Sequence, residues 1–432
     1  MFLLQGVFHL IAFVAVVFSM APEGSSTLIV YDPKLTELSE YSKFIEGLTT
    51  RSHDITYLPI NNETKNIDLF IHDNDKKYNH LVLLPVKGKK VTRMLTDKLL
   101  LRFVEDGGDI LAVTSPITQT DSIRLFLNQL GIFTAPRGSI LKNPLQGEND
   151  ELIKVGGKHI LNKYVLGYDF NDDDEFIFSK DTSACLVGEG SQLIPLINAP
   201  RTSFTQVKNA EHWTDSTQGF LSVGFQSLNN ARVSWIGSQE FLSDKFNNKN
   251  GYLVDELTKW TFKEKSILKS FGAKHTHADL TTYESLPYKV GDKIIYEIGI
   301  SEWNGENWVP FKTDDLQFEL KLVDPYYRFN LKQKEITNNV CVYTSGEFKL
   351  PDHHGVFTFV TDYKRSGLSF IKESDVKAIR HLANDEYPRS FEISNAWVYL
   401  SGIFTVISSW VIFVILFLIT GKRNVNLEKK MN

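Results

Sequence analysis

Cysteine is scarce in this chain of 432 residues, which contains only Cys185 and Cys341. A chain of this length can bury large cores, so its fold need not depend on disulfides. Cys185 lies in Ser-Ala-Cys-Leu-Val without flanking glycines, so no pattern marks it as a nucleophile. The spacing leaves open whether the two cysteines pair or remain isolated buried thiols.

Strong net charge and phosphate-binding motifs are also lacking. The formal net charge is −5, which argues against nucleic acid as a partner. The sequence has no G-x-G-x-x-G motif and no Walker A loop. The basic stretch Lys87-Gly88-Lys89-Lys90 leaves phosphate contact open, but a solvated loop is the simpler interpretation because no Gly-Lys-Ser/Thr ending follows.

Charged residues and histidine are absent from residues 396–420. A helix of this length spans roughly 37 Å, enough to cross a hydrocarbon core of about 30 Å with some tilt. Trp397 and Tyr399 suit the headgroup level at one end, and Lys422 and Arg423 follow the other end. We therefore predict a transmembrane helix over 393–420.

The charge distribution predicts the orientation of this helix. Basic residues after the helix place the tail 421–432 in the cytosol by the positive-inside rule, so the preceding chain is expected to be lumenal. The apolar stretch 2–20 is followed by small residues and predicts a signal peptide over 1–22, with an uncleaved N-terminal anchor as the alternative. Asn62-Glu63-Thr64 is the sequon, and we predict a glycan on Asn62.

Residues 26–150 alternate between strand and helix patterns. Thr27–Tyr31 and Asp109–Val113 are continuous apolar runs, as in buried parallel strands, and Thr96–Glu105 has the spacing of an amphipathic helix closed by Gly107. This order predicts a doubly wound α/β sheet of the flavodoxin type. We assign 23–265 to one lumenal α/β domain, with its parallel core at 26–150 and a β-rich extension at 151–265.

The extension shows strand patterns and a closing helix. Strands are expected at 182–187, 192–196, 219–225 and 231–237, followed by a helix over 253–262. The segment Arg232-Val-Ser-Trp-Ile-Gly-Ser238 and this helix resemble the end of glutamine-amidotransferase-like domains that lack their enzymatic residues. The acidic run Asp172-Asp173-Asp174-Glu175 is more typical of a solvated turn than of a metal site.

Residues 266–392 predict an all-β, sandwich-like domain. Strand patterns recur with Pro, Gly and Asp turns, and 316–323 alternates polar with apolar residues. Two clusters, His275-x-His277-x-Asp279 and Asp352-His353-His354, have metal-like composition, but zinc would require ligands from both to converge. Polar loops are the simpler interpretation. Trp303 and Trp308 flank a loop that suits either sugar stacking or a packed hairpin turn.

Several segments together resemble one family. They are the juxtamembrane stretch Lys377–Leu400 and the shorter motifs Asp324-Pro-Tyr-Tyr-Arg328, Ile300-Ser-Glu-Trp-Asn-Gly-Glu306, Asn198-Ala-Pro-Arg-Thr-Ser-Phe204 and Arg124-Leu-Phe-Leu-Asn-Gln-Leu-Gly131. The chain is similar over nearly its whole length to the 48-kilodalton, wheat-germ-agglutinin-binding subunit family of the oligosaccharyltransferase. Lys429 and Lys430, the fourth and third residues from the end, look like a dilysine endoplasmic-reticulum retrieval signal read by coatomer.

The resemblance implies a non-catalytic, structurally essential subunit in the endoplasmic reticulum membrane. Its complex transfers oligosaccharide from dolichyl pyrophosphate to Asn of N-x-S/T sequons. Implied partners are the catalytic subunit, a ribophorin II-type subunit, a small DAD-type subunit and membrane lipids. We expect no catalytic, cofactor or metal residues in this chain. Candidate docking residues flank the membrane: Arg380, Asp385, Glu386, Arg389 and Trp397.

A second hypothesis belongs to a different class. A lumenal enzyme or glycan-binding protein could act alone through the α/β crevice or the Trp303/Trp308 loop. That hypothesis predicts turnover or glycan binding without partners. The subunit hypothesis predicts that the purified lumenal part shows no transferase or hydrolase activity and needs no metal.

Overall fold

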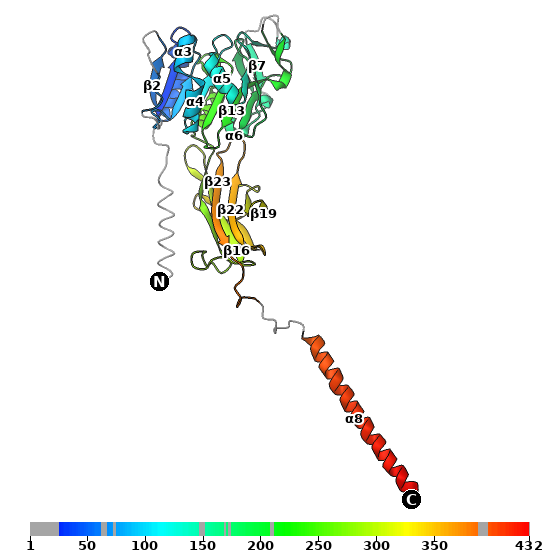
Figure 1. Ribbon diagram of the computed structural model, residues 1–432. Helices are drawn as coiled ribbons and strands as arrows, with labels where there is room; N and C mark the ends of the chain where they lie inside the picture. The colour runs from blue at the N-terminus through cyan, green and yellow to red at the C-terminus, as the bar shows by residue number, and fades with distance from the viewer. Residues whose placement is uncertain are drawn as a thin grey trace.

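The computed structural model describes residues 26–61, 67–71, 75–146, 152–167, 170–171, 174–207, 211–387 and 396–431, with only the backbone at 89, 90 and 422–431. The predicted signal segment 1–22, the sequon residue Asn62 and the docking candidate Arg389 lie outside these residues. Figure 1 shows an α/β domain, a β domain below it and a long C-terminal helix.

In the described part of the chain, a nine-stranded sheet forms the centre of the α/β domain. Its parallel strands follow the order β2-β1-β3-β4-β14. They are β1 (Ser26–Tyr31), β2 (Asp54–Pro59), β3 (His80–Leu83), β4 (Asp109–Val113) and β14 (Arg232–Ile236). The inner strands β3, β4 and β14 are buried along their whole length, which explains why their sequences are mostly apolar without alternation.

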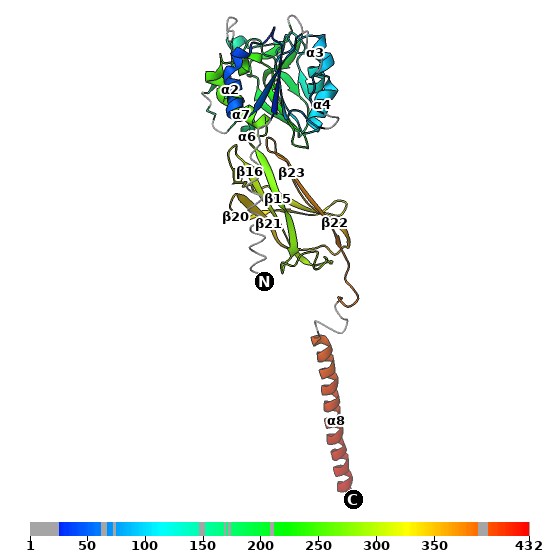
Figure 2. The same ribbon diagram turned by 90° about the vertical axis from the view of Figure 1, so that its left-hand side faces the viewer.

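Helices cover both faces of this sheet, as Figure 2 shows. One face packs against α2 (Ser42–Thr50) and α7 (Asn247–Thr261), and the other against α4 (Asp97–Glu105) and α5 (Asp121–Gln129). Thr96 caps α4 because its hydroxyl accepts a hydrogen bond from Leu99 N at 3.3 Å. The shorter helices are η1 (Leu38–Tyr41), α3 (Lys89–Met94), η2 (Pro144–Gln146), η3 (Gly157–His159), α6 (Lys163–Leu166), η4 (Ser216–Gln218) and η5 (Gln239–Leu242).

Antiparallel strands extend the sheet beyond β14. The strand β13 (Phe220–Gln226) pairs with β14, and the turn between them places Asn230 at φ +64°. The other strands of the extension are β5 (Ile132–Thr134), β9 (Cys185–Val187) and β10 (Leu193–Asn198). Two small sheets flank it: β6 (Ile140–Lys142) with β11 (Phe204–Gln206) and β12 (His212–Asp215), and β7 (Leu152–Gly156) with β8 (Glu175–Ser179).

The β domain packs two sheets face to face. One contains β15 (Ile267–His277), β16 (Lys293–Trp303), β17 (Trp308–Pro310), β20 (Lys332–Thr337) and β21 (Val340–Lys349); the other contains β18 (Gln317–Lys321), β19 (Pro325–Asn330), β22 (Gly355–Tyr363) and β23 (Ile371–Ile379). The rings of Tyr296 and Phe318 lie 4.2 Å apart between the sheets. The prediction of a mixed α/β domain followed by a β-rich domain is confirmed, whereas the flavodoxin- or amidotransferase-like assignment stays a prediction.

The last helix, α8 (Trp397–Met431), lies apart from both domains in Figures 1 and 2. Within the described ranges it is the one helix long and apolar enough to cross a membrane, and no residue of its apolar window, 397–421, is buried. The helix continues to Met431, through the segment that we predicted as a tail from 421. Lys429 and Lys430 therefore have helical backbone, and their side chains lie outside the described ones.

Candidate functional site

The carboxyl ends of parallel strands are the usual ligand-binding edge of such a sheet. Here the turn after β14 is tightly packed: a Cβ atom added to Gly237 would lie 2.0 Å from the Ser183 carbonyl oxygen. The indole N–H of Trp235 donates to the Thr114 hydroxyl at 2.9 Å. After β1, a carboxylate oxygen of Asp32 accepts a hydrogen bond from the backbone of the following turn at 3.0 Å. These groups at the edge serve the fold.

Neither charged stretch singled out in the α/β domain forms a described site. Lys87 is exposed, and the side chains of Lys89 and Lys90 lie outside the described ones, so phosphate contact there stays untested. Asp172 and Asp173 also lie outside the described residues, while Glu175 pairs with Lys154 at 3.6 Å. Among the residues that the structure does describe, no group of three His, Cys, Asp or Glu residues could hold a metal ion.

The two cysteines are free and buried, one in each domain. Burial raises the pKa of the Cys185 thiol well above its usual value, so it is protonated near neutral pH. A nucleophilic cysteine requires the opposite shift. Cys185 therefore lacks the thiolate character that a nucleophilic cysteine needs.

The histidines with metal-like spacing serve the β domain instead. His275 lies between the Tyr288 hydroxyl and a carboxylate oxygen of Asp375, at 2.8 Å from each, and its ring stacks on Phe359 at 4.6 Å. His277 Nε2 lies 2.9 Å from the Leu286 carbonyl oxygen. The second cluster, Asp352-His353-His354, lies near Tyr326 and His381 rather than near His275. Convergence of the two clusters is not observed among these described side chains.

The Trp303/Trp308 loop packs beneath the α/β domain. The two indole rings lie 5.4 Å apart, and Trp303 is buried. A hollow of about 430 Å³ separates this hairpin from the end of α7. It is lined by Trp303, Asn304, Gly305 and Glu306 from the hairpin, and by Arg51, Glu256, Lys259, Glu264 and Lys265 from the α/β domain.

Charges that line this hollow largely neutralise one another. Arg51 pairs with Glu264 at 3.2 Å. Glu256 pairs with Lys259 at 3.2 Å and also with Lys265. Because these cations already have acidic partners, the hollow has no uncompensated charge among them with which to select an ionic substrate. The Trp303 hairpin is best described as part of the contact between the domains.

That contact is anchored by a fully buried arginine, Arg232, at the start of β14. Its guanidinium donates to the carbonyl oxygens of Trp260, Lys265 and Ser266 at 2.8, 2.9 and 2.7 Å. The guanidinium also lies over the Trp260 ring, 4.9 Å from its centroid. Burial lowers the pKa of Arg232 to about 10, which leaves it charged at neutral pH. Arg232 thus fixes the segment where the chain leaves the α/β domain.

A second crossing point joins the domains through the loop between β22 and β23. Trp260 Nε1 donates to the Gly367 carbonyl oxygen, and Gln226 Nε2 donates to that of Leu368, each at 2.8 Å. Phe370 N donates to the Asn230 side chain at 2.7 Å. Buried hydrogen bonds thus hold the chain at both crossings, the segment that Arg232 binds and the loop between β22 and β23. The junction is therefore not a flexible linker.

The predicted docking segment has a defined core beyond β23. The Arg380 guanidinium makes two bonds to the Glu386 carboxylate, at 2.7 and 2.8 Å. Lys289 Nζ reaches the same carboxylate at 3.3 Å, and Ala383 N donates to it at 2.8 Å. The bonds from Arg380 hold the pKa of Glu386 well below its usual range. Asp385, which follows Ala383 in the same turn, is exposed.

The structure therefore brings two of the five candidate docking residues together. Arg380 and Glu386 meet; Asp385 is adjacent in sequence, and Trp397 lies apart on α8. Lys289, which our sequence reasoning did not select, completes the cluster. No local pattern marks it, because it comes from the loop before β16.

Known families match this chain over both domains. Residues 18–264 match the OST48 N-terminal domain, and residues 275–421 match the OST48 middle domain. This chain belongs to the OST48 family. The first OST48 match covers the described α/β domain, and the second covers most of the β domain and the apolar part of α8.

Relatives in this family extend over nearly all of the chain. The dolichyl-diphosphooligosaccharide–protein glycosyltransferase subunit WBP1 of Saccharomyces cerevisiae is 47% identical over 421 residues, 96% of each chain. The Schizosaccharomyces pombe subunit wbp1 is 27% identical over 92% of this chain and 93% of its own. The Danio rerio 48 kDa subunit is 25% identical over 92% of each. Among solved structures, the mmIFT52 N-terminal domain has a TM-score of only 0.40 at 13% identity, covering 55% of this chain and 97% of its own.

Sequence reasoning missed the junction between the OST48 N-terminal and middle domains. Arg232 begins a mostly apolar strand, and this position alone was a usable signal, since a buried arginine requires partners. Its partners were not predictable, because the carbonyl groups that accept its hydrogen bonds lie next to it only once α7 and the hinge, residues 262–267, have folded.

Proposed function

We propose that this OST48-family chain is a non-catalytic subunit of the complex that transfers oligosaccharide from dolichyl pyrophosphate to asparagine of N-x-S/T sequons. The observation that carries the proposal is the 47% identity, over 96% of both chains, to a relative named as a subunit of that transferase. The packed carboxyl edge, the protonated Cys185 and the separated histidines support a role without chemistry of its own.

The proposed topology is a single-pass type I protein of the endoplasmic reticulum membrane. In this arrangement α8 crosses the bilayer, both folded domains are lumenal, and Asn62 is available for glycosylation. The sequence end, with Lys429 and Lys430, serves as a retrieval address for coatomer. The exposed face of α8 supports contact with lipid and with helices of other subunits.

The proposed partners are the catalytic subunit, the ribophorin II-type subunit and the DAD-type subunit. The segment around Arg380 and Glu386 is proposed to dock them, because its ion pairs hold a defined shape immediately before the chain continues to α8. The junction at Arg232 supports this role, since it couples the α/β domain to the β domain that carries the docking segment.

The experiment that tests this function is purification of a tagged copy from microsomes in mild detergent. We expect a multi-subunit membrane complex that transfers glycan to a sequon peptide, and we expect that activity to fall when this chain is depleted. The purified chain alone should show neither transferase nor hydrolase activity. Recovery of a solitary protein, or turnover by the chain without partners, would contradict the proposal.

Disruption of the docking segment should weaken assembly. Glu386→Gln removes the charge that holds Arg380 and Lys289, so we expect recovery of partner subunits to fall several-fold with the folded domains intact. The matched control is Glu297→Gln, which breaks the ion pair with Lys334 (2.7 Å) elsewhere on the same domain. Equal recovery of partners with both variants would exclude the docking role.

A further inference from the structure

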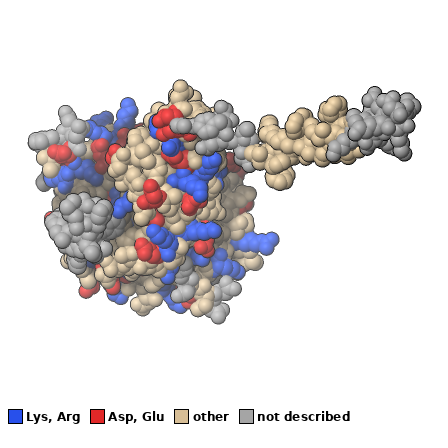
Figure 3. Space-filling view, turned by 90° about the horizontal axis from the view of Figure 1, so that it is seen from below, with Lys and Arg blue, Asp and Glu red and all other residues tan. Residues whose placement is uncertain are grey.

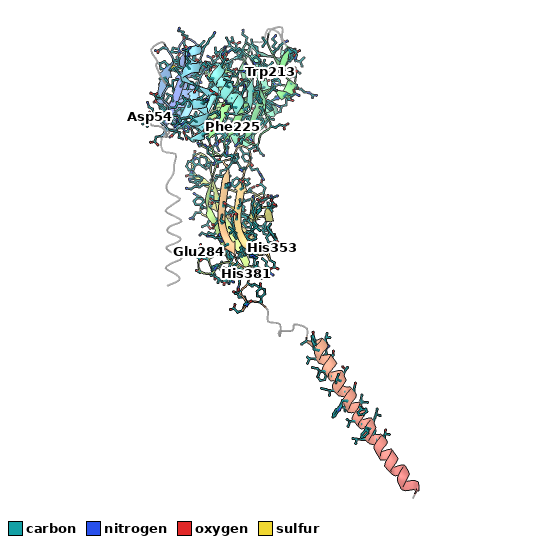
Figure 4. The ribbon with its side chains drawn as sticks, in the orientation of Figure 1. Asp54, Trp213, Phe225, Glu284, His353 and His381 are labelled. Carbon is teal, nitrogen blue, oxygen red and sulfur yellow. The ribbon has the colours of Figure 1, made fainter. Side chains whose placement is uncertain are left out.

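Exposed apolar side chains of the β domain gather at one end, which we call the distal end. It comprises the loops 278–292, 322–324, 350–354 and 380–387 with the adjoining strand ends, on the side away from the α/β domain. Figure 4 shows Glu284, His353 and His381, one from each of three of these loops, at that end. The distal end is also the part of the β domain from which the chain continues toward α8.

The distribution of exposed apolar residues is uneven. Among the described residues of 266–387, nine large apolar side chains are exposed, and one of them, Val376, lies near the middle of β23. Seven lie at the distal end: Leu280, Leu286, Leu322, Val323, Tyr326, Val356 and Tyr387. The ninth, Ile336, lies toward the other end, because it pairs with Cys341, which in turn pairs with Ile300 near the C-terminal end of β16. Clustering of this kind marks a contact surface, whereas scattered single residues would not.

Two of these residues project furthest. Val323, at the turn between β18 and β19, is 89% exposed, and Leu280, in the loop after β15, is 74% exposed. Leu280 also has φ +68°, a left-handed conformation that glycine or asparagine adopts at lower cost. Burial within the chain does not offset this backbone cost, because most of the Leu280 side chain is exposed. A contact outside the chain is what would favour leucine here.

The connection to α8 indicates what that contact is. Trp397 follows Tyr387 by ten positions, so Tyr387 at the distal end lies within about 36 Å of the start of α8. If α8 spans the bilayer as in the proposed function, on which this inference rests, Trp397 and Tyr399 lie at the headgroup level. The distal end is therefore tethered beside the membrane surface.

Charge does not explain an attraction of this end to a membrane. The described cations of its loops, Lys289 and Arg380, are already paired with Glu386. Of the described lysines at the adjoining strand ends, Lys293 pairs with Glu347 and Lys321 pairs with Glu319, which leaves Lys349. The same loops carry six further acids: Asp279, Glu284, Asp292, Asp324, Asp352 and Asp385. Figure 3, which views the molecule from below, shows acidic and basic side chains interspersed with uncharged surface. Attraction to anionic lipid requires a basic cluster, so apolar contact is the remaining source of affinity.

We propose that the distal end of the β domain rests on the lipid bilayer, with Leu280 and Val323 as its principal lipid contacts. Two side chains would bind a free domain weakly, but the tether to α8 keeps them at high effective concentration beside the surface. The β domain then has two attachments to the bilayer. The helix α8 crosses the membrane, and the distal loops contact the membrane surface. This support would fix the tilt of the rigidly joined α/β domain above the bilayer.

Spin labels on the full-length chain, reconstituted in phosphatidylcholine vesicles, test this proposal. Labels go on Leu280→Cys and Val323→Cys, with Ile336→Cys as the matched exposed control and Val411→Cys as the reference within α8. Cys185 and Cys341 are fully buried, so labelling of the folded chain is directed to the introduced thiol. We expect labels at 280 and 323, like the one at 411, to favour collision with oxygen over a water-soluble nickel chelate several-fold more than the label at 336.

The outcomes separate this inference from the proposed function. If the labels at 280 and 323 behave like the one at 336 while 411 is in lipid, the lipid contact is wrong and the anchor stands. If 411 is also in water, the proposed membrane topology fails. If 280 and 323 become shielded from both reagents only in the purified complex, a protein partner covers them and the inference is overturned. A strong increase in contact on adding phosphatidylserine would contradict its apolar basis.

Discussion

Replacing Arg232 with methionine is expected to destabilise the folded chain by about 4 kcal/mol, because it removes three hydrogen bonds from a charged donor, worth ~1.5–3 kcal/mol each, and this loss is partly offset by the removal of a buried charge. The guanidinium donates to three carbonyl groups of the hinge, and Arg232 is fully buried. Methionine fills much of the volume, but the Lys265 carbonyl oxygen loses its donor, and those of Trp260 and Ser266 keep only the backbone N–H groups of Lys263 and Ser369. Arg232→Lys should also destabilise, since lysine keeps the charge but cannot reproduce the planar fork of donors.

Urea unfolding of residues 26–387, followed by tryptophan fluorescence and circular dichroism, measures this effect. The matched control is Arg201→Met, an exposed arginine of the same domain, which should change stability by less than about 0.5 kcal/mol. Because Arg232 binds the hinge, its loss should also speed proteolysis near residues 262–267. An unchanged midpoint and an unchanged cleavage pattern would show that the junction does not depend on Arg232.

The inner parallel strands were predictable because a strand buried on both faces has a mostly apolar sequence of its own. β3 and β4 are covered on both faces, and such strands are apolar runs that need no knowledge of their neighbours. The capped helix α4 was predictable for a similar local reason: Thr96 and Gly107 mark its two ends. These elements depend on patterns that lie within ten or so residues.

Elements held by distant partners were predicted less well. We expected a helix over 253–262, but α7 begins at Asn247, six residues earlier. The added turns are polar and contain Gly251, so their intrinsic helix propensity is low. Asn250 explains their stability, because its side chain exchanges two hydrogen bonds with the backbone of Ile177 on β8. Likewise the strand expected at 182–187 is regular only from Cys185 to Val187, and Thr182 makes an isolated bridge with Ser238 before it.

The candidate site divides in the same way. Arg380 and Glu386 lie six residues apart and were selected from sequence, whereas Lys289 reaches them from 97 residues away and was not. His275 was considered as a ligand because the spacing alone could not place it on β15, where Tyr288 and Asp375 use both ring nitrogens. Local chemistry suggested where to look, and tertiary contacts decided which groups are available.

The second large effect is expected from Gly237→Ala, at the turn that closes the carboxyl edge of the sheet. The new methyl group would lie 2.0 Å from the Ser183 carbonyl oxygen and 2.8 Å from the Trp235 ring. The strand cannot move aside without loss, since Ser183 N donates to the Gly237 carbonyl oxygen at 3.0 Å. We expect destabilisation of about 3 kcal/mol, at the upper part of the range for overpacking.

Gly190→Ala is the matched control in the same domain, because its added methyl group would find only ordinary contacts, the nearest at 3.6 Å. This variant should be neutral or slightly stabilising in the same urea experiment, through the lower entropy of its unfolded chain. If Gly237→Ala were equally benign, the edge after β14 would have room for a side chain. The argument that packing, rather than a ligand, fills the carboxyl edge would then be lost, and with it one of the supports for a subunit without chemistry of its own.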